Sequence, residues 1–502
     1  MNSMKNNIFK SKWISFLAIF TVVYIFFYTF QFNGKMPLYS GEDSFYHVGM
    51  AKFILEKGIV KSFPWLYYTI QNTNFVDHQL LFHLLIIPFI KIFGDNVGPK
   101  LMVMTSLSLA FGFLFLLFRE NKLKYGFIYA IIILFTMPSD FYFRMSFIRV
   151  QAVAILFMVL TFYFIQKNKP LHIGILSFLF VWLYSGSVFL LAIIGSLFIG
   201  QLLANEKINW KIILYGLGGF TLGIIINPYF PKNISYFYNQ LFMTGLGAKP
   251  YSGGEWRPYD TWYWVQISAI SIMLFLTSLV YTISKNIKIN GKTLAILIYT
   301  FFLLILQWKS KRFVEYWPFW ASISAFLLIG QNIESAMQKL VKKNGLVFLL
   351  YIIVGILIIF VVYTKSYEQI GRAQNDTSTG INTISTKSVN DYLIKNSSEG
   401  DIVFTDDWDM FPYYFYYNRK NYYIVGLDPE FMNQFNTSLY KEFADISSGS
   451  DNRNLERIKN DFKAKWVLVF FDHQQFRRNL ETKPELFKKE FDDGTYYLFR
   501  VL

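Results

Sequence analysis

The chain has 502 residues, of which 54% are hydrophobic and 20% aromatic, and its mean hydropathy is +0.32. These values argue against an ordinary soluble enzyme and indicate that most of the chain lies in lipid. The formal net charge of +15 falls mostly in short segments between apolar runs, so it indicates membrane topology and we expect no nucleic-acid partner. There is no cysteine, which excludes disulfides and thiolate metal sites.

Eleven apolar runs are long enough to span a membrane, so we predict a polytopic α-helical membrane protein with about 11 transmembrane helices. One long run is divided by Tyr184-Ser185-Gly186-Ser187, where a turn would give an antiparallel pair of helices. The run at 78–94 is short and contains Pro88, which favours a helix lying in or dipping into the membrane interface. The predicted spans are residues 13–31, 101–118, 125–137, 149–165, 171–184, 187–203, 212–227, 263–283, 293–307, 314–330 and 345–364.

Positive charge predicts the orientation of these spans. With the N-terminus in the cytoplasm, lysine and arginine are more than twice as dense in the cytoplasmic segments as in the outer loops. This bias follows the positive-inside rule, and it collapses if 78–94 is counted as a span. We therefore expect the large first loop, 32–100, and the C-terminal part of the chain to lie outside the cytoplasm of a bacterium-like cell.

A change in composition near residue 365 predicts a second domain. Hydrophobic runs shorten there and charges become frequent, so we divide the chain into a transmembrane domain at 1–364 and a soluble extracytoplasmic domain at 365–502. Strand patterns alternate with helical patterns in the second part, which indicates an α/β domain. The predicted strands are 401–405, 422–426, 466–471 and 495–501, and the predicted helices are near 384–396, 429–446 and 452–463.

Most of the unusual polar residues fall on the predicted outer side of the membrane. Ionisable groups at membrane depth are costly, so their concentration on one side indicates a functional site. These residues are Glu42, Asp43, His47, Asp77, His78, Asp140, Arg144, Arg149, Lys309, Lys311, Arg312, Glu315 and the cluster Asp406, Asp407, Trp408 and Asp409.

The stretch "GEDSFYHVGMAK" (41–52) follows the first predicted span. Asp43 and His47 are four residues apart, which puts both on one face of a helix. Glu42 or Asp43 could cap that helix, with His47 merely interfacial. Asp43 could instead act as a general base or bind a hard divalent cation such as Mg²⁺ or Mn²⁺.

Two later outer loops also carry candidate residues. In "PSDFYFRMSFIRVQ" (138–151), Asp140 and Arg144 share a helical face, and the pair could be structural or part of a site. The segment "GLGAKPYSGGEWRPYDTW" (245–262) is rich in glycine and aromatic residues. Its loop is longer than a connection needs, which favours a mobile segment that covers a substrate.

The segment "QWKSKRFVEYWPFW" (307–320) places cations on the outer side, against the positive-inside trend. Lys311 and Arg312 could snorkel to lipid headgroups, or Arg312 could pair with Glu315 three residues on. A phosphate or pyrophosphate would also suit them, with Arg312 the better bidentate partner.

The sequence "DIVFTDDWDMF" begins with a predicted buried strand and continues into Asp406, Asp407, Trp408 and Asp409. Ligands of α/β sheets bind at the carboxyl ends of strands, so the aspartates could hold a cation, or they could cap the next helix. Trp408 and the tyrosines nearby could stack on a sugar, or pack the domain against the membrane.

Together these segments resemble the GT-C glycosyltransferases, polytopic enzymes that take sugar from a polyprenyl-phosphate carrier. In that class the first outer loop carries an acidic catalytic motif and in-plane helices, and "GEDSFYHVGMAKFILEKGIV" followed by "DHQLLFHLLIIPFIKIFG" is similar. Asp43-Ser-Phe-Tyr-His47 is most similar to the catalytic subunit of oligosaccharyltransferase. That branch has a Trp-Asp motif in its outer domain, approximated here by Trp408-Asp409, and a late essential arginine, for which Arg312 is the candidate.

The resemblance implies an enzyme that transfers a sugar or oligosaccharide from a polyprenyl-phosphate-type donor to an acceptor on the outer face. Asp43 would activate the acceptor or position a cation, while Arg312, with Lys311 or Arg144, would hold the donor phosphate. The double tryptophan and glycine of the family's acceptor motif are absent, so the acceptor stays open. A flippase for a lipid-linked glycan and a non-catalytic scaffold for envelope assembly are the alternatives. The supporting candidates are Glu42, His47, Asp77, His78 and Asp140, with Asp406, Asp407, Trp408 and Asp409 for the acceptor.

Overall fold

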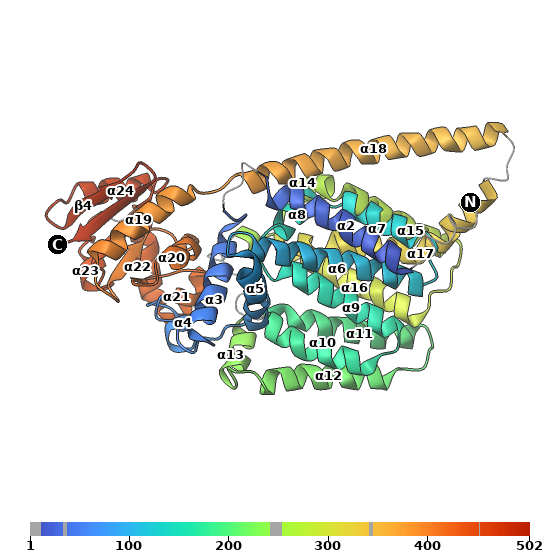
Figure 1. Cartoon of the computed structure of the whole chain (residues 1–502), viewed down its shortest axis with the longest axis horizontal. Helices are drawn as coiled ribbons and strands as arrows, with labels where there is room; N and C mark the ends of the chain where they lie inside the picture. The colour runs from blue at the N-terminus through green and yellow to red at the C-terminus, as the bar shows by residue number, and fades with distance from the viewer. Residues whose placement is uncertain (1–11, 34–37, 241–253, 341–344, 451) are drawn as a thin grey trace.

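The computed structural model describes residues 12–33, 38–240, 254–340, 345–450 and 452–502. It has a helical body and an α/β domain at one end, which lies beside the helices of the first loop (Figure 1). The helices of the body are α2 (Lys12–Gln31), α6 (Gly98–Glu120), α7 (Gly126–Phe135), α8 (Ser139–Met145), α9 (Gln151–Gln166), α10 (Pro170–Leu183), α11 (Val188–Leu203), α12 (Trp210–Ile225), α13 (Lys232–Tyr238), α14 (Thr261–Ile267), α15 (Ala269–Ser284), α16 (Gly291–Lys309), α17 (Trp317–Leu340) and α18 (Gly345–Ser378).

Within the described residues, four helical segments are long and apolar enough to cross a membrane, or up to six if each bent pair forms one span. The bent pairs are α7 with α8, at 94°, and α14 with α15, at 82°. Several further helices, including α9, α10 and α12, are apolar but shorter. The predicted count of eleven spans therefore stays a prediction.

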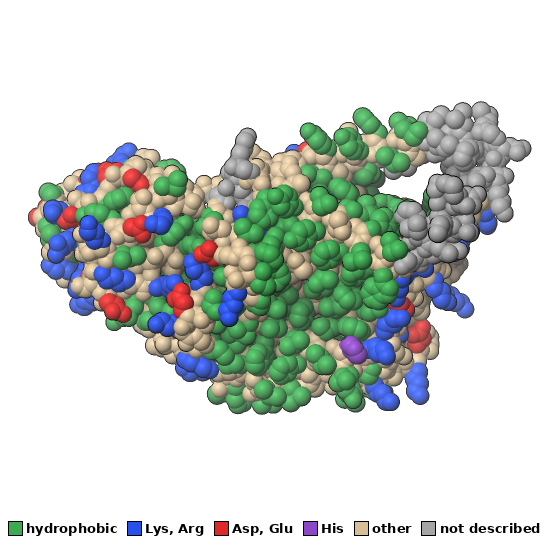
Figure 2. Space-filling model, in the orientation of Figure 1, with side chains coloured by type: hydrophobic (Ala, Val, Ile, Leu, Met, Phe, Trp, Pro, Cys, Tyr) green, Lys and Arg blue, Asp and Glu red, His purple; other side chains and the backbone are tan. Residues whose placement is uncertain are grey.

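The surface of the body matches its composition. Figure 2 shows hydrophobic side chains over the middle of the body, while charged side chains gather on the α/β domain and at the opposite end. On α12, Leu214, Leu217 and Ile225 are exposed. An apolar surface of this kind suits contact with lipid tails.

The first loop folds into three helices, α3 (Glu42–Lys57), α4 (Ile70–Thr73) and α5 (Leu80–Phe93). The helix predicted over 78–94 is present as α5, which has 14 residues and contains Pro88. Gly41 begins α3 with a φ of 71°, a conformation that favours glycine. A Cβ at this position would lie 2.6 Å from the buried ring of Phe147. Gly41 therefore sets where α3 starts.

The C-terminal sheet has five strands in the order β2-β1-β3-β5-β4, which are β1 (Ile402–Thr405), β2 (Tyr422–Tyr423), β3 (Trp466–Phe470), β4 (Phe487–Asp492) and β5 (Tyr496–Val501). Strand β1 pairs in parallel with β2 and β3, while β5 pairs antiparallel with β3 and β4. Strand β4 was not predicted, because "FKKEFD" is a largely solvent-facing edge strand with charged residues.

The helices of this domain are α19 (Thr383–Asn396), α20 (Phe411–Tyr417), α21 (Pro429–Phe435), α22 (Thr437–Ser447), α23 (Arg457–Asn460) and α24 (Gln474–Glu481). The helix predicted over 429–446 is divided at Asn436, whose side chain caps α22. The single helix α18 runs through residue 365 to Ser378, so the backbone has no break at the domain boundary proposed from composition.

The first loop holds the α/β domain in place. Tyr423 in β2 accepts a hydrogen bond from the Tyr67 amide and donates one to the Trp65 carbonyl, both at 2.8 Å. This short parallel contact covers the edge of the sheet. Helix α20 packs on α3, where Gly49 lets the Phe415 ring approach.

Replacing Gly41 by alanine should disturb both folding and the position of the residues that follow it. Backbone strain and the clash with Phe147 together predict a loss of at least about 2 kcal/mol. Thermal unfolding in detergent would measure the loss. The matched control is Gly195→Ala, since a Cβ at Gly195 meets nothing within 4 Å. Equal midpoints for the two variants would contradict this account of Gly41.

Candidate functional site

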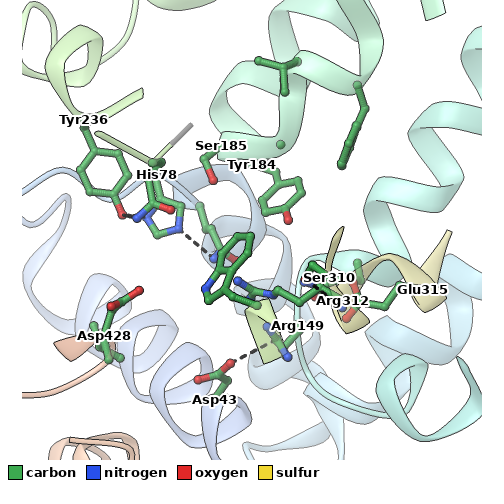
Figure 3. A pocket seen from close by; sticks show the side chains of 18 of the residues that line it. Asp43, His78, Arg149, Tyr184, Ser185, Tyr236, Ser310, Arg312, Glu315 and Asp428 are labelled. Carbon is green, nitrogen blue, oxygen red and sulfur yellow. Dashed lines mark hydrogen bonds and ion pairs between the residues drawn. The ribbon is translucent and has the colours of Figure 1, made fainter. Parts of the chain in front are cut away.

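A cavity of about 330 Å³ lies where the first loop, the body and the α/β domain meet. Its wall includes Asp43 and His47 from α3, and Arg312 from the 3₁₀ turn η4 (Lys311–Glu315). The α/β domain contributes Leu427 and Asp428. Figure 3 shows the labelled polar side chains converging on this space. Charged groups from three parts of the chain thus share one partly enclosed volume.

Asp43 lies in the first turn of α3 and faces Arg149, which lies between α8 and α9. The Arg149 Nε and Asp43 Oδ2 atoms are 3.2 Å apart (Figure 3). The Arg149 side chain is only 5% exposed, whereas the Asp43 side chain is 41% exposed. Gly41 occupies the N-cap position, and no side chain caps α3. Asp43 is therefore a cavity carboxylate held by a buried guanidinium.

Glu255, in the 3₁₀ turn η3 (Gly254–Trp256), is the centre of a cluster of arginines. Its two carboxylate oxygens accept hydrogen bonds of 3.2 Å from Arg144, and the Arg312 Nε lies 3.1 Å away. Arg149 is also within 3.7 Å of Glu255. Burial opposes the charged form of Glu255, but the three guanidiniums hold its pKa well below the usual value.

Two further contacts hold the arginines in place. Arg144 donates a hydrogen bond from its Nε to the buried carboxylate of Glu315. The Arg312 guanidinium lies 4.5 Å from the centre of the Trp256 ring. Three guanidiniums that converge on one carboxylate can bind a phosphate in the same way, because guanidinium groups match the geometry of both anions.

The histidines of the first loop form a second set of polar contacts at the cavity. His47 lines the cavity and its Nδ1 is 2.9 Å from His83 Nε2. His83 Nδ1 is in turn 2.7 Å from Asp77 Oδ2. His78 also lines the cavity, 2.8 Å from the Tyr236 hydroxyl, and burial lowers its pKa to about 4.

Several predicted site residues lie outside the cavity wall. Glu42 is exposed on α3, and the Lys311 ammonium lies over the Tyr259 ring. Asp140 accepts hydrogen bonds from Tyr259 and Tyr263. Asp77 is buried against His83, and Arg144 belongs to the arginine cluster through its hydrogen bonds to Glu255.

The four residues of the "DDWD" segment also lie away from the cavity wall. Asp407 accepts backbone hydrogen bonds from Trp408 and Asp409, so it orders its own turn. The buried Asp406 accepts a hydrogen bond from the Phe470 amide. The α/β domain reaches the cavity through Leu427, Asp428 and Phe431 instead.

The surroundings of Asp43 bear on the predicted cation site. Its carboxylate faces a guanidinium, and it belongs to no group of three metal-ligand side chains among the described residues. Such a group does occur in the α/β domain, where ligand atoms of Asp406, Asp472 and His473 lie within 4.8 Å of one another. A divalent cation at Asp43 stays a prediction.

Four important residues received no individual role from the sequence. Arg149 and Glu255 lie in outer segments singled out for other reasons, and His83 lies within the apolar helix α5. Asp428 precedes Pro429 and caps α21, a local pattern that the sequence does carry. Arg149 and Asp428 line the cavity, and Glu255 and His83 contact residues that line it, through pairings between distant segments.

No protein-family model matches the chain, and no curated protein matches it by sequence. Solved structures do match. The oligosaccharyltransferase of Archaeoglobus fulgidus, tethered to an acceptor peptide containing the NVT sequon, aligns with a TM-score of 0.65 at 13% identity. That alignment covers 98% of this chain and 74% of the other. The same archaeal enzyme with an inhibitory peptide and a dolichol-phosphate gives a TM-score of 0.63 at 12% identity, over 97% and 74% of the two chains.

A second kind of solved structure matches along both chains. ArnT from Cupriavidus metallidurans, bound to undecaprenyl phosphate, aligns with a TM-score of 0.57 at 13% identity, over 96% of this chain and 97% of the other. The protein therefore has the GT-C fold, with the archaeal oligosaccharyltransferase among the structures it resembles. The expected resemblance to this class is confirmed at the level of fold, and the apolar helices mark an integral membrane protein.

Asp428 gives the cavity a pH-dependent charge. Burial raises the pKa of its carboxyl to about 6, so ionisation in the folded state costs up to about 3 kcal/mol. The stability linked to the neutral form is complete at pH below about 4 and is lost as pH rises through about 6. Asp428→Asn should therefore raise the thermal midpoint at pH 7 and leave it nearly unchanged at pH 4. The same gain at both pH values would contradict this.

Proposed function

We propose that the protein is a membrane glycosyltransferase that moves a sugar or oligosaccharide from a polyprenyl-phosphate-type donor to an acceptor at the cavity. The observation that carries the proposal is the convergence of Arg144, Arg149 and Arg312 on one carboxylate beside Asp43. Three guanidiniums gathered on one carboxylate beside the cavity present donors that also match a phosphate, which supports an anionic ligand. The solved structures with a dolichol-phosphate and with undecaprenyl phosphate support a lipid phosphate as that ligand.

The arginines would bind the donor phosphate and stabilise its departure. Arg149 and Arg312 line the cavity, so their guanidiniums can reach a phosphate oxygen. As the bond between the anomeric carbon and the phosphate oxygen breaks, negative charge grows on the phosphate, and fixed guanidiniums lower the energy of that state. Glu255 would have to yield its place to the phosphate, since both anions need the same donors.

Asp43 would orient the acceptor opposite this phosphate. Its carboxylate is partly exposed in the cavity, and the contact with Arg149 fixes its direction. The acceptor would also contact Leu427, Asp428 and Phe431, which bring the α/β domain into the site. The predicted outer location of this site, and the cytoplasmic N-terminus, rest on the distribution of positive charge.

Asp43→Asn should abolish transfer while the protein still folds. We expect the rate to fall at least about 100-fold, because the acceptor loses its charged partner. The assay would follow release of polyprenyl phosphate from a synthetic polyprenyl-phosphate sugar by purified protein. The control is Glu56→Gln on the same helix, where the Glu56 side chain is 50% exposed. A flippase or a scaffold would release no product from any variant, and wild-type activity in Asp43→Asn would remove Asp43 from the mechanism.

Arg312→Ala should weaken donor binding. Loss of one charge-assisted contact predicts a Kd for polyprenyl phosphate that is about 10-fold higher. Binding of radiolabelled polyprenyl phosphate would measure the change. The charge-matched control is Arg372→Ala, which removes an exposed arginine that pairs with Glu368 on the same helix. Equal losses in the two variants would point to net charge, and not to a phosphate site at Arg312.

A further inference from the structure

Three buried side chains form a chain of hydrogen bonds that ends at the cavity wall. Asp77, His83 and His47 are 5%, 1% and 4% exposed. The links are 2.7 Å from Asp77 Oδ2 to His83 Nδ1 and 2.9 Å from His83 Nε2 to His47 Nδ1. The chain joins the segment before α5, helix α5 and helix α3. Its last member, His47, lines the same cavity as Asp43 and Arg312.

The carboxylate at one end of this chain determines which ring nitrogen of each histidine carries a proton. A carboxylate only accepts, so the proton between Asp77 and His83 is on His83 Nδ1. A neutral His83 then has a bare Nε2, which accepts the Nδ1 proton of His47. A neutral His47 is left with a bare Nε2. No described side chain donates to that nitrogen.

The charges around His47 keep it neutral before a substrate binds. Burial lowers its pKa well below the usual value, and the positive charge of the nearby Arg149 adds to the effect. The neighbouring Asp43, by contrast, is already paired with Arg149. That contact uses Asp43 Oδ2, while His47 offers a different kind of acceptor, an imidazole nitrogen, to the same cavity.

We propose that His47 Nε2 accepts the proton of an acceptor hydroxyl, and that the acceptor is therefore an alcohol. This inference rests on the proposed function and adds a catalytic residue and an acceptor class to it. A bare imidazole nitrogen in a partly apolar cavity suits a neutral hydroxyl, which needs a base as its oxygen attacks. His83 and Asp77 are positioning residues, because they act through the proton on His47 Nδ1.

The proposed transfer forms one bond, breaks one bond and moves one proton within the site. The acceptor oxygen forms a bond to the anomeric carbon, and its proton moves to His47 Nε2. The bond from the anomeric carbon to the donor phosphate breaks, and its electron pair leaves with the phosphate oxygen that Arg149 and Arg312 face. The imidazolium of His47 is stabilised through His83 by the charge of Asp77, and it releases its proton to water after the product leaves.

Asp77→Asn provides the sharpest test. It keeps the size of the side chain, and it can move the proton of each histidine from one ring nitrogen to the other. An asparagine amide can donate to His83 Nδ1, which places a proton on His83 Nε2 and leaves His47 with a proton on Nε2. We expect kcat to fall at least about 100-fold with the donor KM within twofold. His83→Gln should retain most activity, since its amide oxygen can accept the His47 proton, whereas His83→Phe should not.

His47→Ala supplies a readout that a structural role would not affect. The kcat of this variant should fall by a similar factor. Added imidazole should restore part of the kcat, because it can enter the space that the His47 ring leaves beside the cavity. The assay would use a polyprenyl-phosphate sugar as donor with methyl glycosides, a serine peptide or an asparagine peptide as acceptor. Transfer to a glycoside or the serine peptide is the expected result, and transfer to the asparagine peptide alone would overturn the hydroxyl assignment.

The outcomes separate this inference from the proposed function. If wild-type protein transfers sugar and both His47→Ala and Asp77→Asn keep full kcat, the proton chain is structural and the inference is wrong. If wild-type protein neither binds polyprenyl phosphate nor transfers sugar, the proposed function is wrong, and the inference that rests on it is wrong as well. If His47→Ala does not fold, the contrast between His83→Gln and His83→Phe decides, because equal activity in those two variants would overturn the role of the chain.

Discussion

The cost of burying positive charge organises the centre of this protein. Arg144, Arg149 and Arg312 come from segments that are far apart in the sequence, and each needs an anionic partner where water is scarce. Glu255, Glu315 and Asp43 supply those partners. Satisfying the charges therefore brings α8, η3, η4 and the start of α3 together, and the cavity lies among them.

On the proposed function, the same arrangement would let the cavity bind an anionic ligand. The three guanidiniums around Glu255 are already oriented by that carboxylate, and the same donors would bind a phosphate in its place. The exchange of Glu255 for a phosphate would cost little reorganisation of the arginines. It would require η3 to move, since Glu255 is the group that has to leave.

The α/β domain completes the site by docking on the first loop. Its sheet edge pairs with residues 65–67, and α20 packs on α3, so Asp428 and Asp43 reach one cavity although 385 positions separate them in the sequence. The buried chain from Asp77 to His47 is a second consequence of how the first loop folds. It joins α3 to α5, and it fixes which nitrogen of His47 is free.

The sequence by itself determined the helical class and the presence of a helix within 78–94, and it singled out the segment around Asp43. Apolar length, charge bias and helical spacing are local properties, and a single sequence contains them. It also identified Arg312 as a cation placed against the positive-inside trend. Only the tertiary structure decided that Arg149 faces Asp43, that Glu255 joins three arginines and that His83 orients His47. Those pairings depend on which distant segments pack together, and no local period records that choice.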